Sequence, residues 1–251
     1  PFQPDQADLQ IMQDTSPDYR VYNTTIRPDQ DSRTSYFHKS LGGYSGVKMK
    51  RYDEILPQIE EGNMSVIDML NAKYFIVGGK DGQNHAEKNP GALGNAWFVN
   101  DYKLVPNADS EYTNLTHFNP GETAIVNQPK FGSYLANAHI QKDTTGFIKL
   151  LSYEPNHLVY KSGAKSEQLA VFSEIYYKDG WNAFVDGKPA DYIQVNYILR
   201  AMLIPAGNHE IVFKFQPKEY SIGEKISLAG SLVLLLGCLG MFLGPLWKPK
   251  A

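Results

Sequence analysis

The sequence predicts an α+β, mostly β fold: a mixed α/β N-terminal part, then an antiparallel β-sandwich and one C-terminal transmembrane helix. The chain has 251 residues, and its 16 tyrosines, together with Val, Ile and Thr, favour strands. Short β-rich runs separated by turn residues fill 147–217, and an uncharged apolar run fills 226–246. A net charge of only −3 argues against a nucleic-acid partner.

Residues 1–146 are expected to form the mixed α/β subdomain. The spacing of apolar residues predicts a helix over 52–59, which Pro57 should break or kink. Ser65 and Asp68 resemble a capping box at the start of a further short helix. The polar stretch 78–90 is expected to be a loop. Strands are expected at 19–22, 74–77, 97–99, 102–105 and 123–126.

Residues 147–217 are expected to form the antiparallel β-sandwich. Ile211, Phe213 and Phe215 lie at alternate positions, which is typical of a strand with one buried face. The dipeptide Asp186-Gly187 follows a β-rich run and indicates a hairpin turn. The other expected strands are 147–151, 158–161, 169–177, 181–185 and 195–203.

The apolar run 226–246 would form a helix about 32 Å long, which matches a hydrocarbon core of about 30 Å. Tyr220 and Trp247 flank it and suit a membrane interface. Residues 218–225 are expected to be a juxtamembrane linker and 247–251 a cytoplasmic tail. Lysines lie on both sides of the run, so charge alone does not decide its orientation.

Four glycines, Gly230, Gly237, Gly240 and Gly244, fall on one stripe of this predicted helix. Such a stripe predicts close packing against another membrane helix, although glycine is also common in spans generally. The chain begins at Pro1 without an initiator Met. Both features predict the C-terminal piece of a longer polytopic protein.

The familiar sequence signals of catalysis are missing. The chain has no dinucleotide-binding or phosphate-loop motif, and no two of its six histidines have metal-ligand spacing. The only cysteine, Cys238, lies in the apolar run. No catalytic residue, metal or cofactor is therefore predicted, and a hydrolase whose acids come together from distant strands stays open as a minor alternative.

One stretch, 31–44, combines cations, aromatic rings and a Gly-Gly turn. Its cations could hold a phosphate, and its rings could stack on a sugar. Trp181 could provide a further stacking surface, as an alternative to packing in the core. The alternative for the stretch is an ordinary loop whose rings pack inward. The candidate ligand-binding residues are Arg33, Tyr36, His38, Lys39, Tyr44 and Trp181.

Five segments together resemble the bacterial YfhO-type integral membrane proteins: 31–52, 69–77, 89–99, 118–126 and 173–217. The resemblance implies a large multi-span protein similar to the lipid-dependent sugar transferases of the C-type fold. Such proteins use polyprenyl-phosphate sugars to decorate cell-envelope polymers. It also implies that this chain is the extracytoplasmic C-terminal region and last span of a protein in the bacterial cytoplasmic membrane. The catalytic acids would lie in the N-terminal membrane domain, so none is assigned here.

The predicted function is a non-catalytic accessory region that positions an acceptor glycan or packs against the membrane domain. The expected partners are the lipid bilayer, other transmembrane helices of the parent protein, and an envelope glycan or polyprenyl-phosphate sugar. The alternative is a membrane-anchored structural or protein-interaction module without any role in sugar transfer.

Overall fold

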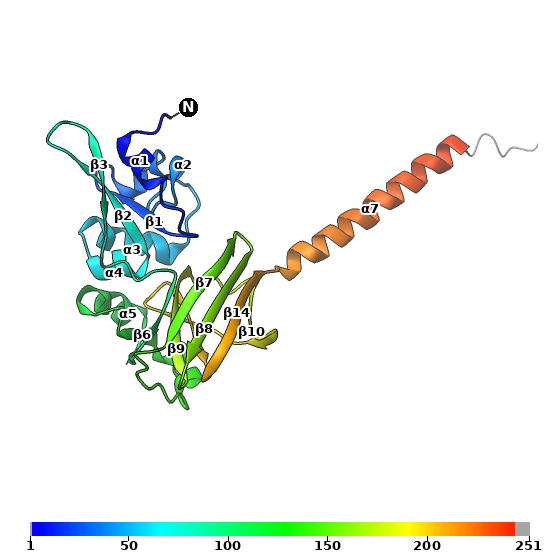
Figure 1. The fold of residues 1–251 in the computed structure, drawn as a ribbon. Coiled ribbons are helices and arrows are strands. Elements are labelled where there is room, and N and C mark those ends of the chain that lie inside the picture. Colours follow the sequence, from blue (N-terminus) through cyan, green and yellow to red (C-terminus); the bar gives the residue numbers. More distant parts are fainter. Residues whose placement is uncertain (1, 244–251) are drawn as a thin grey trace, which may run out of the picture.

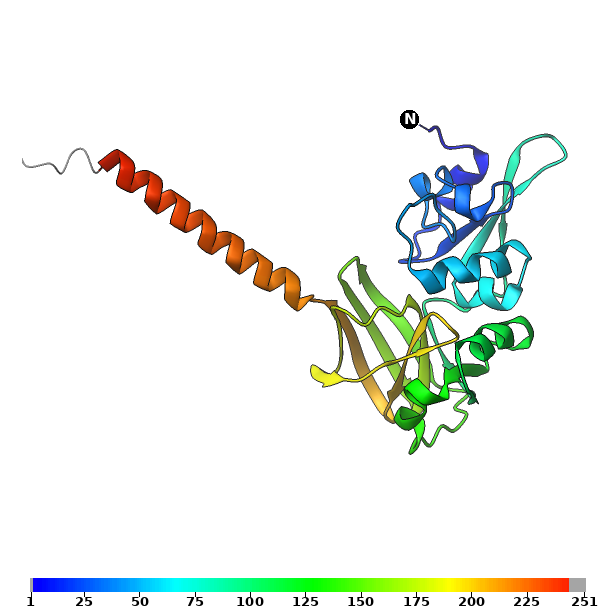
Figure 2. The ribbon, with the colours of Figure 1, turned by 180° about the vertical axis from the view of Figure 1, so that it is seen from behind.

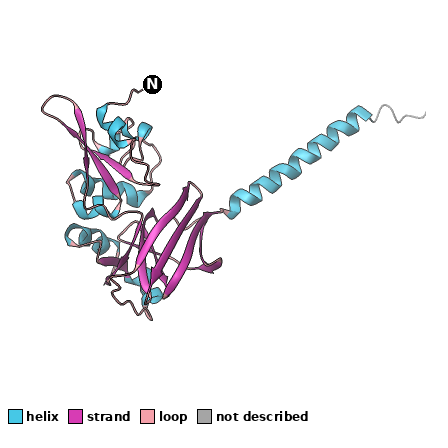
Figure 3. Ribbon diagram, viewed as in Figure 1, coloured by secondary structure: helices cyan, strands magenta, loops and turns pink. Residues whose placement is uncertain are grey.

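The structure is a computed structural model that describes residues 2–243, and it consists of two lobes and a projecting helix (Figure 1). The first lobe is residues 2–95, the second lobe is residues 96–217, and the helix α7 spans Lys218–Leu243. Helices and strands are mixed in the first lobe, and antiparallel sheets dominate the second (Figure 3). The predicted fold class is therefore confirmed.

A small three-stranded sheet forms the centre of the first lobe, with β1 parallel to β2 and β2 antiparallel to β3. The strand β3 corrects the prediction of a loop over 78–90. It is an edge strand of polar and charged residues, so it lacks the apolar alternation that marks a strand in the sequence. The elements of this lobe are α1 (Gln6–Ile11), β1 (Arg20–Asn23), η1 (Pro28–Gln30), α2 (Thr34–Phe37), α3 (Lys50–Glu60), α4 (Met64–Met69), β2 (Ala72–Gly78) and β3 (Asn84–Lys88).

The helix α3 continues through Pro57, contrary to the predicted break. Proline lacks the N–H that would bond the carbonyl of Asp53 one turn earlier. Both residues lie on the exposed side of the helix, where water can bond that carbonyl, while Ile55 and Ile59 are buried on the other side. The apolar face therefore holds the helix together across the proline.

The short helix α4 begins two residues earlier than the predicted capping box. Its cap is Asn63, whose side chain accepts a hydrogen bond from the Ser65 N–H at 3.1 Å. The Ser65 hydroxyl instead donates to the carbonyl of Phe118 at 2.8 Å and so ties the first lobe to the second.

The second lobe is a sandwich of two antiparallel sheets, with strand orders β11-β10-β14-β8-β7 and β12-β13-β9-β4. Helices and the parallel pair β5-β6 flank the four-stranded sheet (Figure 2). Its elements are β4 (Ala96–Val99), β5 (Asp101–Val105), α5 (Ala108–Asn114), η2 (Leu115–His117), β6 (Thr123–Asn127), α6 (Gln128–Phe131), η3 (Gly132–Leu135), β7 (Phe147–Glu154), β8 (His157–Ala164), β9 (Gln168–Ile175), β10 (Trp181–Val185), β11 (Lys188–Ala190), β12 (Ile193–Val195), β13 (Leu199–Ile204) and β14 (Gly207–Phe215).

The four-stranded sheet is buried on both faces. Phe172 of β9 points toward the five-stranded sheet, where it meets Tyr160 and Phe213 edge-to-face at 5.0 Å each. Leu169 and Val171 point to the other face and pack against the helices and β6. Because both faces are covered, β9 and β13 are almost continuously buried and show no polar alternation.

Hydrogen bonds cross the expected domain boundary at residue 146. The strand β4 pairs with β9, which joins residues 96–99 to the sandwich. The predicted strand 195–203 is in fact two strands, β12 and β13, joined by a turn at Asn196 and Tyr197 with left-handed φ angles of 49° and 70°. Asn196 exchanges hydrogen bonds with Ile125 of β6, each at 2.8 Å. The turn therefore fastens the sandwich to the helical flank.

The helix α7 begins at Lys218, so the expected linker 218–225 is helical. It projects from the second lobe (Figure 1). Residues 218–241 are long and apolar enough to cross a membrane, and the apolar part of the helix is not buried against the rest of the described chain. Eight residues precede Ile226, which places the apolar run about 12 Å beyond the start of the helix. Gly230, Gly237 and Gly240 lie on α7, whereas Gly244, the end of the predicted span and the tail 247–251 lie outside the described residues.

Replacing the turn residue by Asn196→Ala should lower the free energy of unfolding by about 1–3 kcal/mol. The substitution removes the acceptor of the buried Ile125 N–H, and alanine disfavours the left-handed backbone. Urea unfolding of the full chain in detergent micelles would measure the change. The matched control Asn208→Ala, at an exposed asparagine of β14, should stay within about 0.5 kcal/mol of the wild type. Equal effects of the two substitutions would contradict this role of the turn.

Candidate functional site

Two of the predicted ligand-binding residues, Arg33 and His38, are engaged by one buried carboxylate of the first lobe. Arg33 Nη2 lies 2.6 Å from Asp8 Oδ2, and His38 Nε2 lies 3.0 Å from Asp8 Oδ1. Asp8 is fully buried in α1. These contacts hold α1 against the segment 33–38, so both side chains already have a structural partner.

The remaining predicted residues of stretch 31–44 lie apart from that carboxylate. Tyr36 is exposed and meets Phe2 edge-to-face at 5.7 Å. Tyr44 is 79% exposed on a loop. Lys39 forms an ion pair with Asp18, and its ammonium lies 3.2 Å from the ring centroid of Tyr153. The structure therefore does not bring the predicted residues together into one site.

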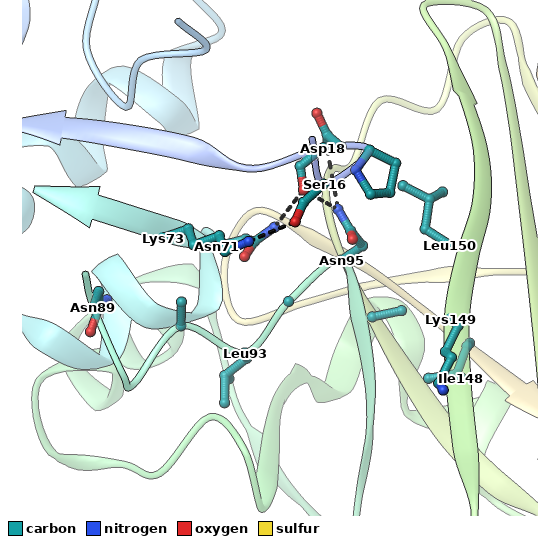
Figure 4. Close-up of a pocket in the computed structure, with 14 residues that line it drawn as sticks. Ser16, Asp18, Asn71, Lys73, Asn89, Leu93, Asn95, Ile148, Lys149 and Leu150 are labelled. Atoms are coloured by element: carbon teal, nitrogen blue, oxygen red, sulfur yellow. Dashed lines mark hydrogen bonds between the residues drawn. The ribbon is translucent and has the colours of Figure 1, made fainter. Parts of the chain in front are cut away.

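A cavity of about 500 Å³ lies between the two lobes (Figure 4). The strand β7 forms one wall, and Asn71 and Asn95 form the other. Both amides donate to the carbonyl of Asp18, at 3.2 and 2.8 Å, and Lys73 donates to Ser16 at 2.7 Å. These polar groups bond one another, which is typical of a seam between lobes.

A second group of charged residues surrounds Glu174, near the end of β9. Arg20, Arg200 and Lys39 all interact with its carboxylate electrostatically. Arg20 is fixed by hydrogen bonds from Nη1 to the carbonyls of Leu70, at 2.7 Å, and Ser173, at 2.9 Å. Burial raises the pKa of Glu174, and the neighbouring arginines oppose this shift without cancelling it.

Arg200 is a charged residue at the second position of the buried strand β13. Its side chain is 2% exposed, and its Nε donates to the carbonyl of Ile175 at 3.1 Å. The guanidinium carbon lies 4.2 Å from the ring centroid of Trp181, which is cation–π stacking. Its Nη1 has no hydrogen-bond partner among the residues that the structure describes. This is a buried cation whose hydrogen-bonding capacity is largely unused.

Glu174 and Arg200 line one cavity of about 340 Å³, which we name the foot cavity. Phe215, the last residue of β14, also lines it, and α7 begins three residues later at Lys218. The cavity therefore lies at the start of the apolar helix. Its lining residues are Met49, Pro155, Glu174, Ile175, Tyr177, Trp181, Arg200 and Phe215.

Trp181 also lines a second cavity of about 430 Å³, which we name the aromatic trough. Rings line it next to ammonium, amide and carboxylate side chains. Rings of this kind stack on the C–H face of a sugar, and the polar groups bond its hydroxyls. The trough therefore has the chemistry of a glycan site. Its rings are Tyr176, Trp181, Phe184 and Tyr192, and its charged and amide side chains are Lys178, Asn182 and Asp191.

Sequence reasoning selected Trp181 but missed Glu174 and Arg200. A signal for Arg200 exists, because it is the one charge in the apolar strand 199–204. For Glu174 the signal is weak, because the residue lies in a mixed segment at a strand end. Within residues 2–243, no group of three or more His, Cys, Asp or Glu side chains is placed to hold a metal.

The structure also bears on the alternative of a hydrolase. Such a site needs two carboxylates facing one another across an open cleft. Asp18 lines the cavity between the lobes, whereas Glu174 lines the foot cavity. Asp18 is further occupied by its ion pair with Lys39. Asp18 and Glu174 therefore do not face one another across one cleft, as a hydrolase site would need.

The substitution Glu174→Gln should stabilise the protein at pH 7. A raised pKa in the folded state means that the ionised carboxylate destabilises the fold, so wild-type stability falls as pH rises through that pKa. The advantage of Gln should shrink as the pH falls through about 4 and be gone near pH 3, where the carboxyl is protonated in the folded and unfolded states alike. Urea unfolding at pH 7 and near pH 3 measures this, with Glu87→Gln, at an exposed carboxylate of β3, as control. A less stable Gln variant at pH 7 would show that the arginines' need for a counter-charge dominates.

Comparison with known protein families finds a match for most of the second lobe and the start of α7. Residues 126–227 match the family described as bacterial membrane protein YfhO. The match runs from β6 into α7, and it contains the whole aromatic trough and every lining residue of the foot cavity except Met49. No curated protein matches the chain. The chain therefore contains a region of the YfhO family of bacterial membrane proteins.

Proposed function

We propose that this chain is the extracytoplasmic, non-catalytic accessory region of a YfhO-family membrane protein that transfers sugars from a polyprenyl-phosphate carrier to cell-envelope polymers. In this proposal α7 crosses the bacterial cytoplasmic membrane, the two lobes lie outside, and the aromatic trough holds a glycan. The family match and the apolar helix support the membrane part of the proposal. The resemblance to C-type sugar transferases supports the chemistry.

The observation that carries the proposal is the composition of the aromatic trough. The rings of Tyr176 and Tyr192 meet edge-to-face with centroids 5.6 Å apart, and Trp181 and Phe184 also line the trough. Asp191 and Lys178 place a carboxylate and an ammonium at its rim. A sugar ring presents an apolar face and a hydrogen-bonding edge, so it can use both parts of this surface.

The position of the trough also suits a glycan at the membrane. The first eight residues of α7 hold the second lobe about 12 Å from the hydrocarbon boundary. The headgroup layer occupies about 5–8 Å of that distance. In this proposal the lobe that carries the trough lies next to the headgroups, where a sugar on a lipid carrier or a growing polymer would be found.

Glycan binding by the full chain in lipid nanodiscs tests the proposal. Phe184→Ala should weaken the binding of an envelope glycan about fivefold to tenfold, because one stacking contact of about 1–1.5 kcal/mol is lost. The matched control is Phe147→Ala, at a phenylalanine that lies on β7 at the far edge of the same sheet and is 38% exposed. The control should bind within about twofold of the wild type.

Two outcomes would count against the proposal. Equal glycan binding by Phe184→Ala and Phe147→Ala would show that the glycan does not bind in the trough. No glycan binding by the wild type, together with full sugar transfer by a parent enzyme that lacks residues 2–217, would end the accessory role. The structural or protein-interaction module would then be the better account.

A further inference from the structure

We propose that the foot cavity binds a zwitterionic amino-phosphate group, with the phosphate on Arg200 and the ammonium on Glu174. This chemistry occurs in the headgroup of phosphatidylethanolamine and in free phosphoethanolamine. The inference does not rest on glycan binding, because the foot cavity and the aromatic trough are separate spaces that share only Trp181 as a lining residue.

The phosphate half of the proposed site is Arg200. A guanidinium carries five N–H donors in a planar fork that matches two phosphate oxygens. Arg200 uses Nε on the carbonyl of Ile175, and Nη1 has no partner among residues 2–243. Stacking on Trp181 at 4.2 Å, with Phe213 at 5.3 Å, fixes the plane of the fork. A buried cation held in this way is stabilised when an anion reaches it.

The ammonium half of the proposed site is Glu174. Its carboxylate lines the same cavity as Arg200. Among the described residues only burial and longer-range charges act on it, and no hydrogen bond does. Four charged groups around it, Arg20, Arg200, Lys39 and Asp18, interact with it only at longer range. A ligand ammonium can therefore donate to oxygens that the protein leaves free.

The two charges together select the ligand class. A purely anionic group on Arg200 would be repelled by Glu174, and a purely cationic group on Glu174 would be repelled by Arg200. A phosphate joined to an amine by two carbons presents both charges at a short separation. The remaining wall is mostly apolar, with Met49, Pro155 and Phe215, and it lies at the start of α7, where a lipid headgroup can approach.

Lipid selectivity of the full chain in nanodiscs tests this inference. We expect the chain to retain phosphatidylethanolamine over phosphatidylglycerol about fivefold, measured by native mass spectrometry of the lipids that stay bound. Glu174→Gln should reverse the preference, because the phosphate site remains and the repulsion of an anionic headgroup is gone. Glu87→Gln, a carboxylate of β3 far from the cavity, should keep the wild-type preference. A purely structural role of Glu174 would change stability without changing headgroup preference.

Arg200→Gln should lose retention of both lipids, and because that buried substitution can impair folding, the decision rests on Glu174→Gln. If free phosphoethanolamine displaces the bound lipid, the cavity recognises the amino-phosphate group alone. If the lipid stays bound in its presence, the cavity recognises the headgroup as part of a whole lipid. Equal retention of the two lipids by the wild type, or an unchanged preference in Glu174→Gln, would overturn the inference. Neither result affects the glycan test at Phe184, so the two proposals fail separately.

Discussion

No described part of the chain covers the apolar surface of α7, and this exposure constrains where the two lobes can lie. Leu234 is 72% exposed and Met241 is 76% exposed. Each leucine-sized side chain left in water forgoes about 1.5–3 kcal/mol of burial, and a run of such residues exceeds the 5–15 kcal/mol by which a domain is stable. A bilayer removes this cost. Once α7 lies in lipid, the end of the second lobe that carries Trp181 must lie near the membrane surface.

The doubly covered four-stranded sheet explains why charged residues gather where they do. The five-stranded sheet lies on one face and the helical flank on the other, so a polar side chain on β9 or β13 has no route to solvent except at a strand end. Glu174 lies at such an end, and Arg200 reaches toward it from the neighbouring strand. The same layering places Arg20 of β1 against Ser173. Charged residues therefore connect the two cavities: Asp18 lines the cavity between the lobes, Glu174 and Arg200 line the foot cavity, and their charges interact.

Periodicity predicted the elements that bury one face or that are apolar throughout, such as β14 and α7. It failed at β3, whose polar edge position gives no apolar pattern, and at Asn196-Tyr197, where non-glycine residues adopt the left-handed turn. For the site, residue types alone selected Trp181, which lines both the foot cavity and the aromatic trough. They could not show that Arg33 and His38 contact Asp8, because that carboxylate is 25 and 30 residues away in the chain. Only the folded structure brings these partners together.

Flotation of the full chain with liposomes after alkaline carbonate extraction, which removes proteins bound only to the surface, tests whether α7 crosses a bilayer. We expect the full chain to float with the lipid after extraction, and a variant ending at Gln216 not to float. A full chain that sediments as a monomer in detergent-free buffer, with Leu234 and its neighbours shielded from solvent, would contradict this expectation. In that case α7 would not hold the foot cavity and the aromatic trough near a membrane surface.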